Sequence, residues 1–129
     1  MAELPLVLAI TGASGAPYAV RLLQGLVAAG QPTWLIVSDH GFRLLDTESG
    51  IASIEALRER VGATPWDATV RVFDDKDRGA LPASGSVRTK GMVICPCSMG
   101  TVAAIAAGTS RSLVERAADV VLKERRKLV

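Results

Sequence analysis

The sequence predicts a three-layer α/β fold, Rossmann-like (flavodoxin-like), in which helices cover both faces of a parallel sheet. Short, almost wholly apolar runs, as expected of central parallel strands, alternate with segments that carry apolar residues at helical spacing. Turns rich in glycine, serine or threonine follow three of the apolar runs. Such alternation is typical of parallel α/β sheets, which bind ligands where their strands end.

Length and composition fit a single domain over residues 1–129. Of the 129 residues, 49% are hydrophobic and 22% charged, which allows a sizeable core and excludes the disordered class. A net charge of +2 is too small to indicate a nucleic-acid partner. No apolar stretch has the length of a membrane span, and the first residues lack the pattern of a signal peptide. We therefore expect a cytoplasmic protein with no membrane or nucleic-acid partner.

The first expected strand, Leu6 to Ile10, leads into a turn of small residues, Thr11 to Ala16, and then into a helix from about Pro17 to Ala29. Gly12 and Gly15 allow a ligand to approach the main chain closely. The N–H groups at the start of a helix, together with its dipole, favour a phosphate at such a turn. The pattern is not the dinucleotide-binding G-x-G-x-x-G, so anion binding and simple packing of the glycines both stay open.

A second expected strand, Thr33 to Val37, precedes Ser38, which either binds a ligand at the strand end or caps the next helix. His40 could act as a base, although an incidental position is the simpler interpretation. Two helices are expected next, at 42–47 and at 54–61, the second bounded by Gly62 and Pro65. Glu48, near the end of the first of these helices, is by pattern alone a surface carboxylate.

The expected elements in the second half are a strand at 69–73, an exposed charged turn at 74–79, a loop of small residues at 83–86, a strand at 91–95, a turn at 97–101 and helices at 102–107 and 112–126. We interpret the charges of the turn as solvation only. Arg116 and Lys123 are seven residues apart and so share one helix face. Residues 127–129 look like the opening of another strand, and because a parallel sheet needs that strand and a cover, we expect a chain truncated at its C-terminus.

Three turns with glycine, serine or threonine at the ends of strands predict one shared ligand that carries a phosphate. No pyrophosphate fingerprint is present, so a mononucleotide such as FMN is a better candidate than NAD. Cys95, Cys97 and His40 are too few soft ligands for a zinc site, and we expect no metal. The two cysteines are interpreted as buried thiols.

Four motifs resemble the UbiX/Pad1-type flavin prenyltransferases, in that family's order and spacing along essentially the whole chain. They are Thr-Gly-Ala-Ser-Gly-Ala at 11–16, Ala-Ser-Gly-Ser at 83–86, Met-Val-Ile-Cys-Pro-Cys-Ser-Met-Gly-Thr at 92–101 and Glu-Arg-Ala-Ala-Asp-Val-Val-Leu-Lys-Glu-Arg-Arg at 115–126. The family joins the dimethylallyl group of dimethylallyl phosphate to N5 and C6 of reduced FMN. The prenylated FMN serves UbiD-type decarboxylases, one of them in ubiquinone synthesis.

The resemblance implies roles for individual residues. Gly12, Ala13 and Ser14 would contact FMN, with Ser14 near N5, and Glu48 would be the catalytic carboxylate that handles protons. The other FMN-binding residues implied are Ser38, Ser98, Met99, Gly100 and Thr101. The residues implied for the prenyl phosphate are Ser84, Gly85, Arg116 and Lys123. The family also implies a homo-oligomer, commonly a dodecamer, with sites near subunit interfaces.

The chemistry agrees with these roles, since fixed cations and N–H donors stabilise a leaving phosphate without a metal. Family members continue with a strand, an Arg-Glu pair and a segment that holds a Tyr and an Arg for the prenyl phosphate, so we expect this chain alone to be weak or inactive. Two alternatives stay open: an FMN-dependent cysteine-peptide decarboxylase, and a non-catalytic FMN-binding or assembly subunit. The joint presence of the motifs at 83–86 and 123–126 favours the prenyltransferase.

Overall fold

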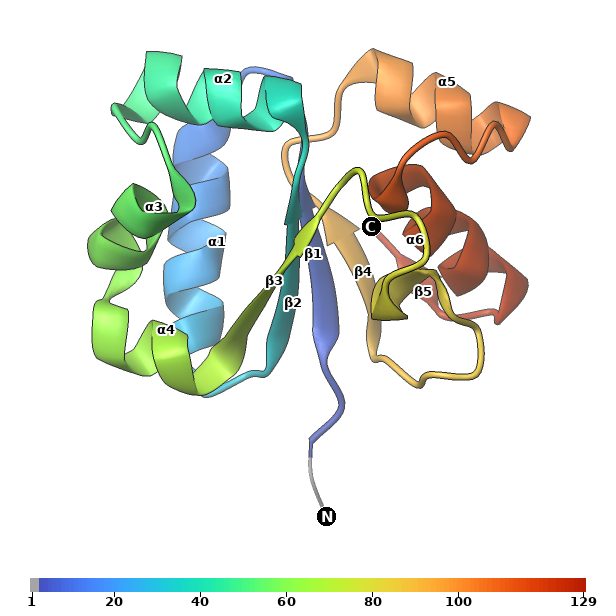
Figure 1. The fold of residues 1–129 in the computed structure, drawn as a ribbon, viewed down its shortest axis with the longest axis horizontal. Coiled ribbons are helices and arrows are strands. Elements are labelled where there is room, and N and C mark those ends of the chain that lie inside the picture. The colour runs from blue at the N-terminus through green and yellow to red at the C-terminus, as the bar shows by residue number, and fades with distance from the viewer. Residues whose placement is uncertain (1–2) are drawn as a thin grey trace.

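The computed structural model describes residues 3–129 and contains a five-stranded parallel sheet between two layers of helices (Figure 1). The strands are β1 (Leu6–Ile10), β2 (Thr33–Val37), β3 (Val70–Asp74), β4 (Gly91–Ile94) and β5 (Lys127–Leu128). Their order in the sheet is β3-β2-β1-β4-β5, and every neighbouring pair is parallel. This confirms the predicted Rossmann-like class and places the topological switch point between β1 and β4.

The helices divide between the two faces and the carboxyl edge of the sheet. They are α1 (Ala16–Ala28), α2 (Asp39–Ser49), α3 (Ile54–Val61), α4 (Ala63–Thr69), the 3-10 helix η1 (Leu81–Ala83), α5 (Met99–Ala107) and α6 (Leu113–Lys123). Figure 1 shows α1, α3 and α4 on one side of the sheet and α6 and η1 on the other. Helices α2 and α5 lie at the top of that view, where β1 and β2 end.

Each face of the sheet has its own apolar core. Side chains alternate along β1, so Leu8 and Ile10 pack with α1 in one core, whereas Val7 and Ala9 pack with α6 in the other. All four side chains are at most 1% exposed. Burial on both faces explains why these strands read as continuous apolar runs in the sequence.

Three helix starts differ from the expectation. The sequence pattern does not predict helix α4, because Pro65 fits the end of a helix. In the structure Pro65 lies in the first turn of α4, where a proline removes no helical hydrogen bond. Helices α2 and α5 begin three residues earlier than expected, because Ser38 and Ser98 cap them. The Oγ of Ser38 accepts from the N–H of Gly41 at 3.0 Å, and the Oγ of Ser98 accepts from that of Thr101 at 3.1 Å.

Two elements of the second half are shorter than expected. Strand β4 ends at Ile94, and Cys95 makes the last bond to β1, from its N–H to the carbonyl of Ala9 at 2.9 Å. Pro96 has no N–H, so it cannot donate the next hydrogen bond of the strand pairing. Helix α6 ends at Lys123 rather than at 126, and the chain then turns into β5, which pairs with β4.

Candidate functional site

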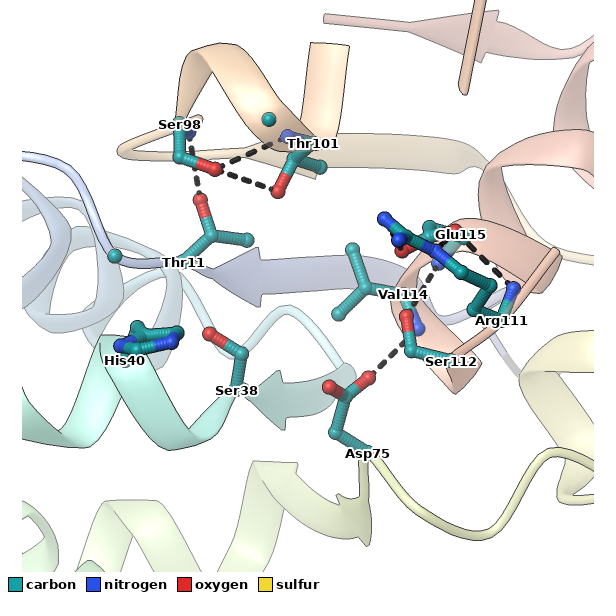
Figure 2. A pocket seen from close by; sticks show the side chains of 12 residues that line it. Thr11, Ser38, His40, Asp75, Ser98, Thr101, Arg111, Ser112, Val114 and Glu115 are labelled. Atoms are coloured by element: carbon teal, nitrogen blue, oxygen red, sulfur yellow. Dashed lines mark hydrogen bonds and ion pairs between the residues drawn. The ribbon is translucent and has the colours of Figure 1, made fainter. Parts of the chain in front are cut away.

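A cavity of about 280 Å³ lies at the carboxyl edge of the sheet (Figure 2). It is lined by Thr11, Gly12, Ser38, His40, Asp75, Ser98, Gly100, Thr101, Arg111, Ser112, Val114 and Glu115. These residues follow β1, β2, β3 and β4 or begin α6, and they include both sides of the switch point, where such sheets bind ligands. Ligand pockets usually hold about 300–1,000 Å³. A nucleotide would therefore be only partly covered by this chain.

A carboxylate of the chain itself occupies the N-terminus of α1. Glu48, near the end of α2, accepts hydrogen bonds from the N–H groups of Gly15 at 2.9 Å and Ala16 at 2.8 Å, and from the hydroxyl of Ser14 at 2.7 Å. The Ser14 bond is the largest of the contributions that lower the pKa of Glu48, followed by the two backbone bonds. The donors expected to face a phosphate are thus already bonded, and Glu48 is more than a surface carboxylate.

Gly12 is required because the start of α2 packs against the turn after β1. A Cβ at Gly12 would lie 2.3 Å from the Cβ of His40, closer than real Cβ contacts come. Gly41 is equally constrained, since a Cβ there would lie 2.4 Å from the carbonyl oxygen of Ile10. The two glycines bring Ser38 and His40 to the wall of the cavity.

Hydroxyl groups join the turn after β1 to the turn after β4. The buried Thr11 donates from Oγ1 to the carbonyl of Pro96 at 2.8 Å, and the same oxygen accepts from the N–H of Ser98 at 2.9 Å. The hydroxyls of Ser98 and Thr101 lie 2.8 Å apart. Figure 2 marks the hydrogen bond between them with a dashed line. This network fixes the first turn of α5 beside the end of β1.

Three helices begin at this cavity, and each is capped by a serine that lines it. The serines are Ser38 of α2, Ser98 of α5 and Ser112 of α6. The third cap accepts from the N–H of Glu115 at 3.2 Å. Because helix dipoles are positive at their N-termini, the converging helix ends favour an anionic ligand group.

Asp75 was expected only to be solvated, and this expectation is wrong. Its carbonyl accepts from the N–H of Leu113 at 2.8 Å, and its carboxylate accepts from that of Val114 at 2.9 Å, so Asp75 joins β3 to α6. Burial raises the pKa of Asp75, even though the bond from Val114 lowers it. Asp75 directly follows β3, and the strand-end rule applied to Ser38 would have identified it.

Replacing Asp75 with asparagine should stabilise the protein at pH 7, whereas alanine should destabilise it by about 1–2 kcal/mol because the N–H of Val114 loses its acceptor. Asparagine keeps an acceptor without burying a charge. Since the pKa of Asp75 is raised above its ordinary 3.8, the ionised carboxylate costs stability as the pH rises through that raised value. Urea denaturation at pH 4 and pH 7 measures this, and a less stable Asn variant at pH 7 would contradict it.

The start of α6 was also missed as part of the site. Ser112 and Glu115 have the S-x-x-E spacing of a capping box, a signal present in the sequence. Glu115 is only 8% exposed and accepts from the hydroxyl of Thr109 at 2.6 Å and the N–H of Arg111 at 3.1 Å. Burial raises the pKa of Glu115, but the bonds from Thr109 and from the backbone and side chain of Arg111, together with the charge of Arg111, outweigh it and lower the pKa overall.

The structure brings together most of the residues expected to bind FMN. Those that line the cavity are Gly12, Ser38, Ser98, Gly100 and Thr101. Ser14 lies in the turn that contains Gly12, and its hydroxyl donates to the carboxylate of Glu48. Ala13 lies in the same turn and is half-buried, whereas Met99, the first residue of α5, is 79% exposed.

The residues expected to bind the prenyl phosphate do not line this cavity. A Cβ at Gly85 would lie 2.9 Å from Nζ of Lys123, and the hydroxyl of Ser84 lies 3.0 Å from that of Ser86. Arg116 lines a separate cavity of about 110 Å³ beside η1 and α6. Within one chain these positions lie at or near α6, outside the lining of the cavity at the strand ends.

The cysteines are half-buried free thiols, and burial raises the pKa of both Cys95 and Cys97.

Over residues 3–129, no three His, Cys, Asp or Glu side chains gather closely enough to hold a metal ion. In the same part of the chain, every helix is too short or too polar to cross a membrane.

Comparison with known proteins places these features in a family context. The Flavoprotein family matches residues 1–129. The flavin prenyltransferase UbiX of Pseudomonas aeruginosa is 46% identical over an alignment of 129 positions. The alignment covers 95% of this chain and 61% of that protein. AnUbiX (PadA1), solved in complex with FMN and dimethylallyl pyrophosphate, matches with a TM-score of 0.87 at 34% identity, over 98% of this chain and 63% of that one.

A second solved structure also matches closely. The dodecameric FMN-dependent UbiX-like decarboxylase from Escherichia coli O157:H7 has a TM-score of 0.84 at 39% identity, over 96% of this chain and 63% of that chain. The present chain spans roughly three fifths of the length of the curated relatives that it matches. For three flavin prenyltransferases of the UbiX type, the share lies between 58% and 61%.

Proposed function

Since this chain belongs to the Flavoprotein family, we propose that the whole protein is a flavin prenyltransferase. It joins the dimethylallyl group of dimethylallyl phosphate to N5 and C6 of reduced FMN. The observation that carries the proposal is the bond between Ser14 and Glu48 beside a cavity built from strand-end turns. The identity to curated flavin prenyltransferases supports it.

The flavin phosphate fits best between the N-termini of α2 and α5. The N–H groups of α1 are bonded to Glu48 and those of α6 to Asp75, so each of these helix ends already holds a carboxylate. The ends of α2 and α5 hold only the neutral hydroxyls of Ser38 and Ser98. Asp39, the first residue of α2, is exposed and forms an ion pair with Lys76 at 3.6 Å. A phosphate gains most at the two ends whose N–H groups are not bonded to a carboxylate. The ring then lies over the turn that contains Gly12 to Ser14.

Reduced FMN supplies the nucleophilic atoms, and the chain positions them and moves protons. Glu48 has a lowered pKa and is ionised at neutral pH, so its Oε2 accepts the hydroxyl proton of Ser14 in a hydrogen bond 2.7 Å long. This orients the Ser14 oxygen toward a ligand on the turn. A carboxylate in contact with a hydroxyl can accept a proton delivered through it.

The second substrate requires residues that one chain does not place in the cavity. We propose that Ser84, Gly85, Arg116 and Lys123 bind dimethylallyl phosphate in a site shared between copies of a homo-oligomer. The dodecameric relative supports this assembly. The product would then serve a UbiD-type decarboxylase, and the cytoplasmic location expected from the sequence stays a prediction.

The test is anaerobic incubation of the whole protein with reduced FMN and dimethylallyl phosphate, followed by mass spectrometry of the released flavin. Prenylated FMN is the expected product. Decarboxylation of a peptide that ends in cysteine, with no prenylated flavin, would replace the proposal with a cysteine-peptide decarboxylase. FMN binding with neither reaction would indicate a non-catalytic flavin-binding subunit.

A further inference from the structure

Arg111 differs from every other residue on the wall of the cavity in its charge. Among the lining residues, all within the described range 3–129, it alone carries a permanent positive charge, whereas Asp75 and Glu115 carry carboxylates. The resemblance assigns no role to this position. An anionic ligand in the cavity would face two negative charges, and Arg111 is the side chain placed to offset them.

Glu115 holds the guanidinium group in place. Its Oε1 accepts from the backbone N–H of Arg111 at 3.1 Å and from Nε at 3.3 Å, and Nη2 lies 3.5 Å from Oε2. Within residues 3–129 no hydrogen bond engages Nη1. The side chain of Glu115 is 10% exposed and that of Arg111 is 69% exposed. The largely buried carboxylate of Glu115 therefore positions a guanidinium group that a ligand can reach. Figure 2 shows the guanidinium turned back toward Glu115 and the cavity.

We propose that Arg111 contacts the phosphate of a flavin mononucleotide bound in this cavity and makes the site selective for FMN over riboflavin. This inference rests on the proposed function. The phosphate lies between Ser38 and Ser98, and the remaining N–H groups of Arg111 donate to its oxygens from the α6 side. Guanidinium groups suit phosphate because their planar donors match its oxygens, and Glu115 reduces the rotamer freedom lost on binding.

The experiment compares FMN and riboflavin binding by flavin fluorescence in the wild-type protein and in Arg111→Gln. The FMN Kd should rise by about 10- to 100-fold, because one charge-assisted contact is lost, and the riboflavin Kd should not change. Arg111→Lys should retain part of the FMN affinity. Arg43→Gln, an exposed arginine of α2 outside the cavity, is the matched control and should bind both flavins normally.

The outcomes separate the two proposals. If the wild-type protein binds FMN and Arg111→Gln binds it equally well, the proposed phosphate contact is wrong. The same holds if Arg111→Gln loses affinity for FMN and riboflavin to the same extent. In both cases the proposed flavin site is retained. If wild-type protein binds neither flavin, both proposals fall.

Discussion

Replacing Gly12 with alanine should lower the free energy of unfolding by about 1–3 kcal/mol, because the added methyl overpacks the contact with α2. A Cβ there would lie 2.3 Å from that of His40, so the turn and the start of α2 must separate. That movement displaces Ser38 from the cavity wall, and FMN affinity should fall by about tenfold or more. Urea denaturation and a fluorescence titration with FMN measure the two effects.

Gly25→Ala is the matched control for this prediction. Gly25 lies within α1, is exposed, and a Cβ there meets nothing within 4 Å. Alanine should stabilise the helix by roughly 0.5–1 kcal/mol and leave FMN affinity unchanged. If Gly12→Ala were as stable as Gly25→Ala and bound FMN as well, the packing of α2 on the first turn would not determine the site.

Replacing Glu48 with glutamine should slow prenyl transfer by about 10²- to 10⁴-fold, the usual contribution of a positioned acid–base group. Glutamine has the same shape, and its Oε1 can still accept from Gly15 and Ala16, so the turn and FMN affinity should be largely preserved. It cannot take a proton from Ser14. Single-turnover formation of prenylated FMN, followed by mass, measures the rate.

Glu55→Gln controls for the loss of one negative charge, since Glu55 is exposed on α3 and should have no effect on the rate. A Glu48→Gln variant with the wild-type rate would remove Glu48 from catalysis. Its bonds to α1 would then have only a structural role, and alanine at position 48 should lower stability at neutral pH more than at pH 3. The direction follows from the lowered pKa of Glu48, because its ionised carboxylate stabilises the folded protein at neutral pH and this stabilisation is lost as the pH falls.

Strands β1, β2 and β4 were predictable because burial on two faces leaves a continuous apolar run in the sequence. β1 and β2 match their expected bounds, and β5 forms where residues 127–129 indicated a strand. Helix starts were less predictable, because Ser38 and Ser98 are equally compatible with a ligand role and with a cap, and here both cap. Pro65 fits either the end of one helix or the first turn of another, and nothing local decides between them.

The site was predictable where it follows from strand ends and not where it depends on packing between distant elements. Glu48 reaches Ser14 across 34 positions, a contact that requires α2 to lie over the start of α1. The family resemblance assigned Glu48 a role in proton handling, but neither it nor the sequence pattern predicted this contact. Arg111 and Glu115 reach the cavity because α6 begins beside Asp75. The order of the strands, which the sequence pattern does not determine, produces that proximity.

We propose above all that the flavin binds at the carboxyl edge of the sheet. Backbone amide spectra of isotope-labelled protein, recorded as FMN is added, test it most directly. We expect shifts concentrated at residues 11–14, 38–41 and 98–101 and at the start of α6. Shifts concentrated at Ser84, Gly85 and the end of α6, with none in the turns after β1 and β4, would contradict the claim.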